Sequence, residues 1–322
     1  MSYGSDENGL RRVARGLTPP YLWRALEWTR DFRIRARSKR SGESPPVAPK
    51  ADWEYVPEGW MRQNSDPAIK GWNVAAIADT YRSKWPSFVR AVAGPGPLGV
   101  AHDVPADIEV PRDERGAHHT IMTFAYALTL ASRHSNRLSV LDWGGGPGHY
   151  YVLSRALLPG VEFEYYCKDV PHLVTLGREL VPEVNFSSDQ SCLNRQYDFV
   201  FASGSFQYAE DWRQTFADLA KAAAGYLFVT RLPIARQASS FVVLQRPYRY
   251  GYDTEYLGWV IGRRELLAES ARLQMPLARE FVLDDLLFAP GAPENPTEHR
   301  AFLFQSSSAK ASMRPYVLLD DE

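Results

Sequence analysis

The 322-residue chain lacks most of the features that mark secreted, membrane-spanning or nucleic-acid-binding proteins. Its two cysteines, Cys167 and Cys192, do not make a disulfide framework in a chain of this length, and no metal-ligand spacing is present. A net charge of −1 gives no global attraction to nucleic acid. No apolar run approaches membrane-spanning length, and the first residues lack the apolar core of a signal peptide. These absences predict a cytoplasmic protein with no metal centre and no nucleic-acid partner.

What the sequence does contain is a glycine-rich stretch between an apolar strand and an apolar helix. Residues 140–151 read Val-Leu-Asp-Trp-Gly-Gly-Gly-Pro-Gly-His-Tyr-Tyr. The order strand, glycine turn, helix is typical of a unit of a doubly wound α/β sheet. Glycines leave space for a ligand against the backbone where the strand ends, and they adopt φ angles that other residues avoid. Asp142 stands two residues before the first glycine, so its carboxylate is predicted to reach a cationic group of that ligand.

The spacing of the glycines argues against a dinucleotide. That fingerprint is G-x-G-x-x-G, and counted from Gly144 the sixth position is His149. The stretch instead reads D-x-G-x-G-x-G and resembles motif I of class I S-adenosylmethionine (SAM)-dependent methyltransferases. By that resemblance the glycines make room for the methionine part of SAM and Asp142 helps to hold it. The glycines concerned are Gly144, Gly145, Gly146 and Gly148. The alternative is a tight turn in another kind of α/β protein.

The remaining apolar patterns predict the other elements of such a sheet. Strands are expected near 138–141 and over 161–169, 184–189, 197–208, 226–232, 278–288 and 299–306. Helices are expected over 112–135, 171–180, 212–224 and 263–275. Residues 235–260, rich in tyrosine, are interpreted as a substrate-sized excursion. The fold class is therefore α/β: a doubly wound, seven-stranded Rossmann-like methyltransferase sheet whose last strand is antiparallel.

The segments around this sheet predict a division into three parts. Residues 1–110 hold a basic amphipathic helix, a Pro/Ser linker over 41–50 and an aromatic-rich helical cap. The SAM-dependent methyltransferase domain is assigned to 111–308 and a tail to 309–322. A basic amphipathic helix is able to lie on an anionic membrane surface, which predicts a peripheral membrane contact. The other interpretation is a docking helix with a solvated charged face.

Four places together resemble a family of bacterial SAM-dependent methyltransferases that are often encoded with surface-polysaccharide genes. They are Leu-Thr-Pro-Pro at 17–20, Trp-Glu-Tyr-Val-Pro-Glu-Gly-Trp at 53–60, the stretch 141–151, and Gly-Ser-Phe-Gln-Tyr at 204–208. The resemblance implies SAM as the cofactor and a small-molecule acceptor, and it does not fix which acceptor. Where many small-molecule methyltransferases carry Leu-His after the fourth strand, this chain has Phe-Gln-Tyr.

The resemblance also assigns cofactor contacts beyond the glycines. Asp169, at the end of the second strand, is expected to accept hydrogen bonds from the ribose hydroxyls. Asp189 sits where related methyltransferases often contact the adenine amine. The other residues assigned to the cofactor are Lys168, Val170, Ser203 and Gly204.

A base near the transferred methyl group is required when the acceptor is a hydroxyl, because the sulfonium has already activated the methyl group. The candidate catalytic residues are His149, His118, His119, Gln207 and Tyr208. His149 is equally well explained as a helix-start residue, the histidine pair as polar helix surface, and Tyr208 as core. Three arginines are candidates for binding a carboxylate or phosphate of the acceptor: Arg231, Arg246 and Arg249.

The sequence therefore predicts a SAM-dependent methyltransferase that methylates oxygen on a sugar or another small hydroxylated molecule. Methylation of nitrogen or of a carboxylate on a natural-product scaffold is the alternative among enzymes. A SAM-binding scaffold protein without turnover is the alternative outside them.

Overall fold

The chain divides into two units, residues 1–50 and residues 51–322. The computed structural model describes residues 51–64, 66–96, 98 and 115–306, all in the second unit. The predicted basic helix, the linker at 41–50 and the tail at 309–322 lie outside the described residues. The aromatic-rich segment that follows the linker belongs to the same unit as the sheet.

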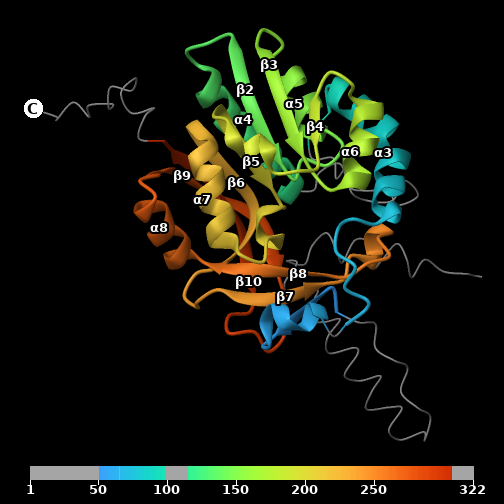
Figure 1. Ribbon diagram of the computed structural model, residues 1–322, viewed down its shortest axis with the longest axis vertical. Helices are drawn as coiled ribbons and strands as arrows, with labels where there is room; N and C mark the ends of the chain where they lie inside the picture. The colour runs from blue at the N-terminus through green and yellow to red at the C-terminus, as the bar shows by residue number, and fades with distance from the viewer. Residues whose placement is uncertain (1–50, 65, 97, 99–114, 307–322) are drawn as a thin grey trace, which may run out of the picture. The chain divides into compact units, whose positions relative to one another are not determined.

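A parallel sheet with the strand order β4-β3-β2-β5-β6 forms the centre of this unit (Figure 1). The strands are β2 (Arg137–Trp143), β3 (Glu162–Lys168), β4 (Asn185–Ser187), β5 (Tyr197–Ser203) and β6 (Ala223–Ala235). The chain runs outward from β2 to β3 and β4, and then returns to the other side of β2 with β5. This reversal of strand order makes the end of β2 the topological switch point, where ligands bind in open α/β sheets.

The last two strands extend the sheet beyond β6. Strand β10 (Thr297–Gln305) lies between β6 and β9 (Leu277–Leu287) and is antiparallel to both. The register between β6 and β10 shifts between Arg300 and Phe302, so β6 carries a bulge there.

Three strands were not predicted from the sequence: β1 (Trp53–Val56), β7 (Phe241–Gln245) and β8 (Tyr256–Gly262). Strand β8 runs parallel to the end of β6, β7 pairs with β8, and β1 pairs with β7. The sheet described therefore has ten strands rather than seven. The interpretation of 235–260 as an excursion is wrong, because Phe-Val-Val-Leu at 241–244 is a buried strand that the surrounding tyrosines obscured.

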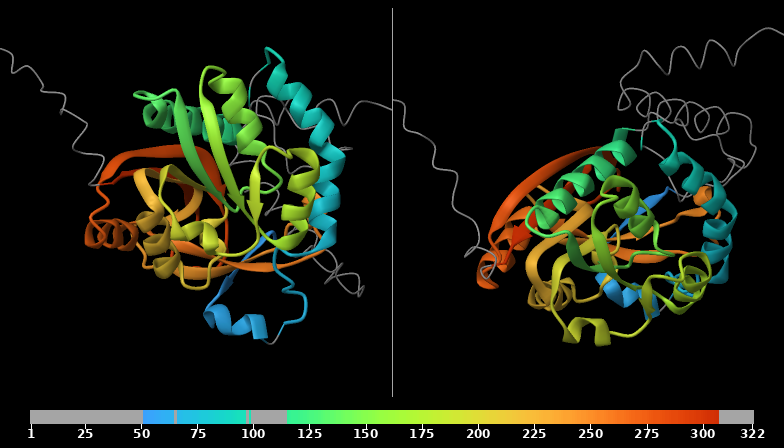
Figure 2. Two further views of the ribbon diagram at one scale, coloured as in Figure 1. Left: turned by 45° about the horizontal axis from the view of Figure 1, so that its top comes forward. Right: turned by 90° about the horizontal axis from the view of Figure 1, so that it is seen from above.

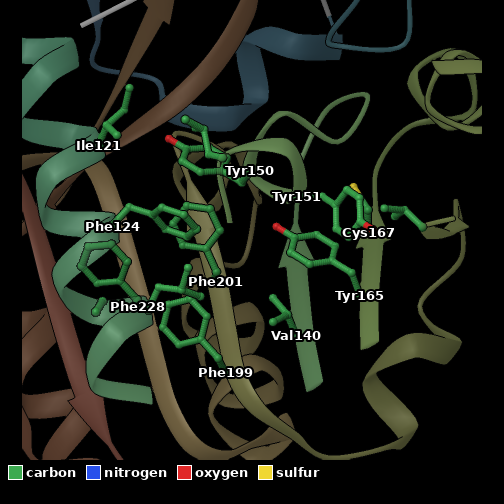
Figure 3. Close-up of a cluster of buried hydrophobic side chains, with 14 of the residues drawn as sticks. Ile121, Phe124, Val140, Tyr150, Tyr151, Tyr165, Cys167, Phe199, Phe201 and Phe228 are labelled. Carbon is green, nitrogen blue, oxygen red and sulfur yellow. The ribbon is translucent and has the colours of Figure 1, made fainter. Parts of the chain in front are cut away.

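Helices cover both faces of the parallel strands. One face packs against α4 (Arg115–Ser132) and α5 (His149–Leu157), and the other against α7 (Trp212–Ala222) and α8 (Arg263–Arg272). Successive strand residues alternate between the two layers: Val140 and Phe199 join the first, Leu141 and Val200 the second. Burial on both faces explains why these strands read as continuous apolar runs in the sequence. Figure 3 shows the aromatic side chains of the first layer between α4 and the strands.

Helix α3 (Ala75–Ala93) packs against α5 and α6 (Pro171–Leu180), and Figure 2 shows α3 running beside α6. The segment predicted as a helical cap thus consists of β1, a short 3-10 helix η1 (Gly59–Asn64) and α3. Another 3-10 helix, η3 (Phe206–Tyr208), follows β5 and contacts β8. The three added strands therefore lie beside the edge at which the parallel strands end.

Replacing Phe124 by alanine is expected to lower the free energy of unfolding by about 3–5 kcal/mol, because the fully buried ring leaves a cavity. Its centroid lies 4.8 Å from the rings of Tyr150 and Phe201. Met122, two residues earlier on the same helix, is 37% exposed. Met122→Ala should change the free energy of unfolding by less than about 0.5 kcal/mol. Urea unfolding of both variants measures the difference, and equal losses would contradict this assignment of the core.

Candidate functional site

The glycine turn joins β2 to α5, and its backbone accounts for the alternation of glycines. Gly144, Gly146 and Gly148 have φ angles of +71°, +61° and +96°, in the left-handed region that other residues rarely adopt. Gly148 is also the residue that begins α5 as its N-cap. Every second residue of the motif is therefore a glycine because the chain reverses hand at each of these positions.

The turn is held from both neighbouring strands. Gly144 donates its backbone N–H to the carbonyl of Lys168 at the end of β3, with N and O 2.7 Å apart. On the other side, the hydroxyl of Ser205 donates to the carbonyl of Trp143 over 2.5 Å. A Cβ atom on Gly144 would lie 2.2 Å from the Cβ of Ser205, so no larger side chain fits there. The two strands beside β2 thus fix the position of the turn.

Asp142 lies beneath the turn and not on its outer side. Its carboxylate is completely buried, and a Cβ on Gly145 would come within 2.3 Å of it. The Tyr165 hydroxyl donates to Oδ2 over 2.9 Å, and Oδ1 has no hydrogen-bond partner among the described residues. Burial, and then the nearby charge of Asp169, raise the pKa of Asp142 to about 8. The Asp142 carboxyl group supports the turn from below, and its contact with a cationic group of a ligand stays a prediction from the sequence.

Asp169 ties the end of β3 to the turn. Its Oδ2 accepts the backbone N–H of Gly146 at 2.7 Å, and its Oδ1 accepts that of Val170 at 2.6 Å. Burial raises the pKa of Asp169, and these two N–H donors act in the opposite direction. An ionised carboxylate offers about four acceptor positions. Two of them remain for a ligand.

The other residues assigned to the cofactor stand at the same edge of the sheet. Lys168 and Ser203 end β3 and β5, and the Lys168 ammonium lies 4.4 Å from the centroid of the Trp143 ring. The hydroxyl of Ser203 is hydrogen-bonded to that of Tyr150 over 2.8 Å. Gly204, with a φ of +58°, follows directly. Asp189 follows β4 and is exposed, and its hydrogen bonds with Ser191 lower its pKa.

His149, the first residue of α5, is buried under helix α3. Its imidazole centroid lies 5.0 Å from that of Tyr81, 5.1 Å from Trp85 and 4.9 Å from Phe88. Only 3% of the residue is exposed. This position joins α3 to the glycine turn by packing, and a catalytic role for His149 stays a prediction from the sequence.

The histidine pair stands at the start of α4, at the ligand edge, because α4 runs back along the sheet before β2 begins. His119 Nδ1 accepts the backbone N–H of Asp284 on β9 over 3.4 Å. His118 Nδ1 is buried with no hydrogen-bond partner among the described residues. Of the pair, His118 is the one with an unused polar atom.

Gln207 and Tyr208 lie in η3, where β5 ends. Tyr208 donates its hydroxyl to Oε1 of Gln245 over 2.7 Å, and its ring packs against Trp72 and Tyr256. Gln207 is buried, and its Oε1 has no hydrogen-bond partner among the described residues. The side chain of Tyr208 is therefore held by contacts with β7 and β8. Oε1 of Gln207, by contrast, is an acceptor with no hydrogen-bond partner among the described residues.

Of the three arginines named from the sequence, Arg231 is brought to this edge. Arg246 is buried in an ion-pair network with Glu54 and Glu255 of the added sheet, and the side chain of Arg249 lies outside what the structure describes.

Sequence reasoning did not find the pair of His299 on β10 and Asp285 on β9. Only the register between the last two strands brings these residues together, and no spacing in the sequence signals it.

In the part of the chain that the structure describes, no three His, Cys, Asp or Glu side chains are grouped so as to hold a metal ion. Within the same residues, no helix combines the length and apolar character needed to cross a membrane.

The buried carboxyl of Asp142 predicts a pH dependence of stability. Because its pKa is higher in the folded chain (about 8) than the ordinary aspartate value of 3.8 in the unfolded chain, the folded state binds more protons. The stability that this group contributes is complete below about pH 4 and is lost as the pH rises through 8. The loss reaches about 1.4 kcal/mol per pH unit for one group.

Urea unfolding of the ligand-free chain between about pH 5 and pH 7 measures this slope. Asp142→Asn should flatten it, while Asp79→Asn on the surface of α3 should not. An unchanged slope in the Asp142 variant would show that the carboxylate is solvated.

Comparisons with known proteins give likeness of structure only, since no family model and no curated protein matches the chain. A magnesium protoporphyrin IX methyltransferase from Synechocystis PCC 6803 with bound SAM is 15% identical over 72% of this chain and 95% of its own, with a TM-score of 0.43. A SAM-dependent methyltransferase from Clostridium acetobutylicum is 11% identical over 62% and 93%, with a TM-score of 0.40. The 1,6-didemethyltoxoflavin-N1-methyltransferase of Burkholderia thailandensis is 10% identical over 62% and 93%, with a TM-score of 0.38. At such identities and scores, these likenesses assign neither a family nor a function to this chain.

Proposed function

We propose that this protein is a SAM-dependent methyltransferase that methylates oxygen on a sugar or another small hydroxylated molecule. The observation that carries the proposal is the turn at the switch point of the sheet. Three left-handed glycines alternate there, with Asp142 below the turn and Asp169 bonded to its centre. When bound, SAM supplies a methyl group that its sulfonium has already activated.

The charges around the turn favour this ligand over a dinucleotide. A pyrophosphate needs unopposed backbone N–H groups at a helix N-terminus. Here the N–H of Gly146 is already bound by the Asp169 carboxylate, and a second carboxyl group lies beneath Gly145. The Asp169 carboxylate repels a pyrophosphate and attracts a sulfonium or an ammonium group, whereas the buried Asp142 carboxyl, with its pKa of about 8, is protonated at pH 7 and adds no charge. The site is therefore suited to a cationic nucleoside.

Individual residues fit the parts of SAM. The two acceptor positions left on Asp169 suit the ribose hydroxyls. Because its pKa is lowered, Asp189 stays ionised, and its carboxylate is able to accept a hydrogen bond from the adenine amine. The glycine turn would hold the methionine part, with Lys168, Val170, Ser203 and Gly204 completing the edge.

The candidate catalytic residues differ in the contacts that they already make within the fold. Gln207 and His118 each hold a buried polar atom with no partner among the described residues, which suits contact with a polar acceptor. His119, Tyr208 and His149 each have contacts within the fold that already explain their positions. Removal of the acceptor's proton by a positioned base contributes about 10²–10⁴-fold to such a transfer.

The wider predictions from the sequence remain proposals. They are a cytoplasmic location, a peripheral membrane contact through the basic helix, and membership of the methyltransferase family that is often encoded with surface-polysaccharide genes. Methylation of nitrogen or of a carboxylate is the alternative reaction, and binding of SAM without turnover is the alternative outside enzymes.

Removing the Asp169 carboxylate is expected to weaken SAM binding about 10- to 100-fold, because hydrogen bonds to a charged group contribute about 1.5–3 kcal/mol. Asp169→Asn keeps the shape of the side chain but removes its charge and one of its two acceptor oxygens. Calorimetry with SAM measures the affinity, and Asp198→Asn, at the opposite end of β5, is the matched control. Binding of NAD with micromolar affinity and no binding of SAM would refute the assignment.

Gly146→Val is expected to abolish transfer, because a β-branched residue is strained at a φ of +61°. The assay follows labelled methyl groups from SAM to a panel of sugars and hydroxylated acids. Transfer to an oxygen supports the proposed reaction and transfer to a nitrogen supports its alternative. SAM binding by the native chain without transfer to any panel member would favour the scaffold.

A further inference from the structure

Strand β6 contains a residue in a strained backbone conformation at the candidate site. Arg231 has a φ of +54°, one of two positive values outside glycine among the described residues. The bulge between β6 and β10 imposes this angle, since Val229 pairs with Phe302 and Leu232 with Arg300. A left-handed angle is strained for an L-residue, and glycine would avoid that strain. Strain of this kind gathers at functional sites.

The bulge directs the Arg231 side chain to the end of β5. A Cβ atom on Gly204 would lie 3.4 Å from both Nε and Cζ of Arg231. The guanidinium therefore packs over the backbone that follows Ser203, beside the glycine turn. It has five N–H donors, so it can keep contacts within the fold and still bind an anion.

His299 and Asp285 meet near the same bulge. His299 pairs with Pro233 of β6, two residues after Arg231. Its Nδ1 lies 3.2 Å from Oδ2 of Asp285, and its side chain is 12% exposed while that of Asp285 is 59% exposed. Burial, and then the charge of Arg231, lower the pKa of His299, whereas Asp285 acts in the opposite direction. The lowered pKa favours the neutral imidazole at pH 7, and Nδ1 lies close to the Asp285 carboxylate without a hydrogen bond to any described residue.

We propose that Arg231, His299 and Asp285 form the acceptor side of the site and that the acceptor is a hydroxylated anion. Arg231 binds its carboxylate or phosphate group, and His299, oriented by Asp285, takes the proton of the hydroxyl. This assignment rests on the proposed function. As the hydroxyl oxygen gains the methyl group, its proton moves to Nε2 of His299, and the sulfonium sulfur keeps the electron pair of the broken bond. His299 is the catalytic residue and Asp285 a positioning residue.

Binding of small probes tests the anion site separately from catalysis. Calorimetry on the full chain, with and without S-adenosylhomocysteine, compares D-glucuronate and D-glucose 6-phosphate with neutral methyl glucoside. Both anions should bind at least about tenfold more tightly than the neutral sugar, because only they pair with the guanidinium. Arg231→Gly should remove the preference, and Arg231→Lys should retain part of it. A preference for one anion identifies the carboxylate or the phosphate as the group recognised.

Thermal stability distinguishes an anion-binding role of Arg231 from a purely structural one. Arg231→Gly relieves the left-handed angle, so its Tm should stay level or rise by about 2–4 °C while anion binding is lost. Gln274, with a φ of +56° at the end of α8, is the matched control. Gln274→Gly should keep the anion preference intact. Equal binding of all the probes, no binding of any, or an unchanged preference in Arg231→Gly would overturn the proposal.

Transfer of labelled methyl groups to the tighter-binding anion tests His299. His299→Gln should lower kcat by about 100-fold or more with little change in KM, and Asp285→Asn should lower kcat less. Arg231→Gly should act mainly on KM. His134→Gln, an exposed control at the opposite end of α4, should match the native chain. Native-like kcat in His299→Gln, or no transfer to either anion, would overturn the proposal. A native chain that does not bind SAM would instead refute the proposed function.

Discussion

The hydrogen bond between the Asp169 carboxylate and the backbone N–H of Gly146 is the constraint on which the candidate site depends. It joins the end of β3 to a turn that begins at the end of β2, while Ser205 secures the same turn from the side of β5. Three adjacent strand ends therefore fix one loop. The Asp169 carboxylate that holds the loop has two further acceptor positions, and these are the ones proposed to bind the ribose hydroxyls.

Strand β6 connects that site to the rest of the molecule. Its first part lies in the parallel sheet, and its last residues pair with β8 of the added strands. The bulge at Arg231 marks the change between the two parts, and it also places a guanidinium over the end of β5. A single irregularity thus bends the strand and supplies a charge to the site. If Arg231 binds the acceptor as proposed, this role accounts for an arginine at a position where glycine would be less strained.

The added strands and α3 surround the site with aromatic packing. Tyr208 contacts Trp72 and Tyr256, and His149 is enclosed by rings from α3. These contacts explain the positions of two residues, Tyr208 and His149, that the sequence suggested as catalytic candidates. A histidine beside a glycine turn and a tyrosine after a strand carry the same signal whether they act on a ligand or fill a core. The contacts that each side chain makes within the fold separate the two cases, and these contacts are a property of the folded chain.

The sequence by itself determined the strands of the parallel sheet, the glycine turn and the acid at the end of β3, because apolar periodicity and the conformational freedom of glycine are local properties. Only the tertiary structure decided that Asp142 faces inward, that 241–245 is a strand, and that His299 meets Asp285. Each of these depends on which segments become neighbours. Strand register and side-chain burial arise from contacts between residues far apart in the chain, and no spacing within one segment encodes them.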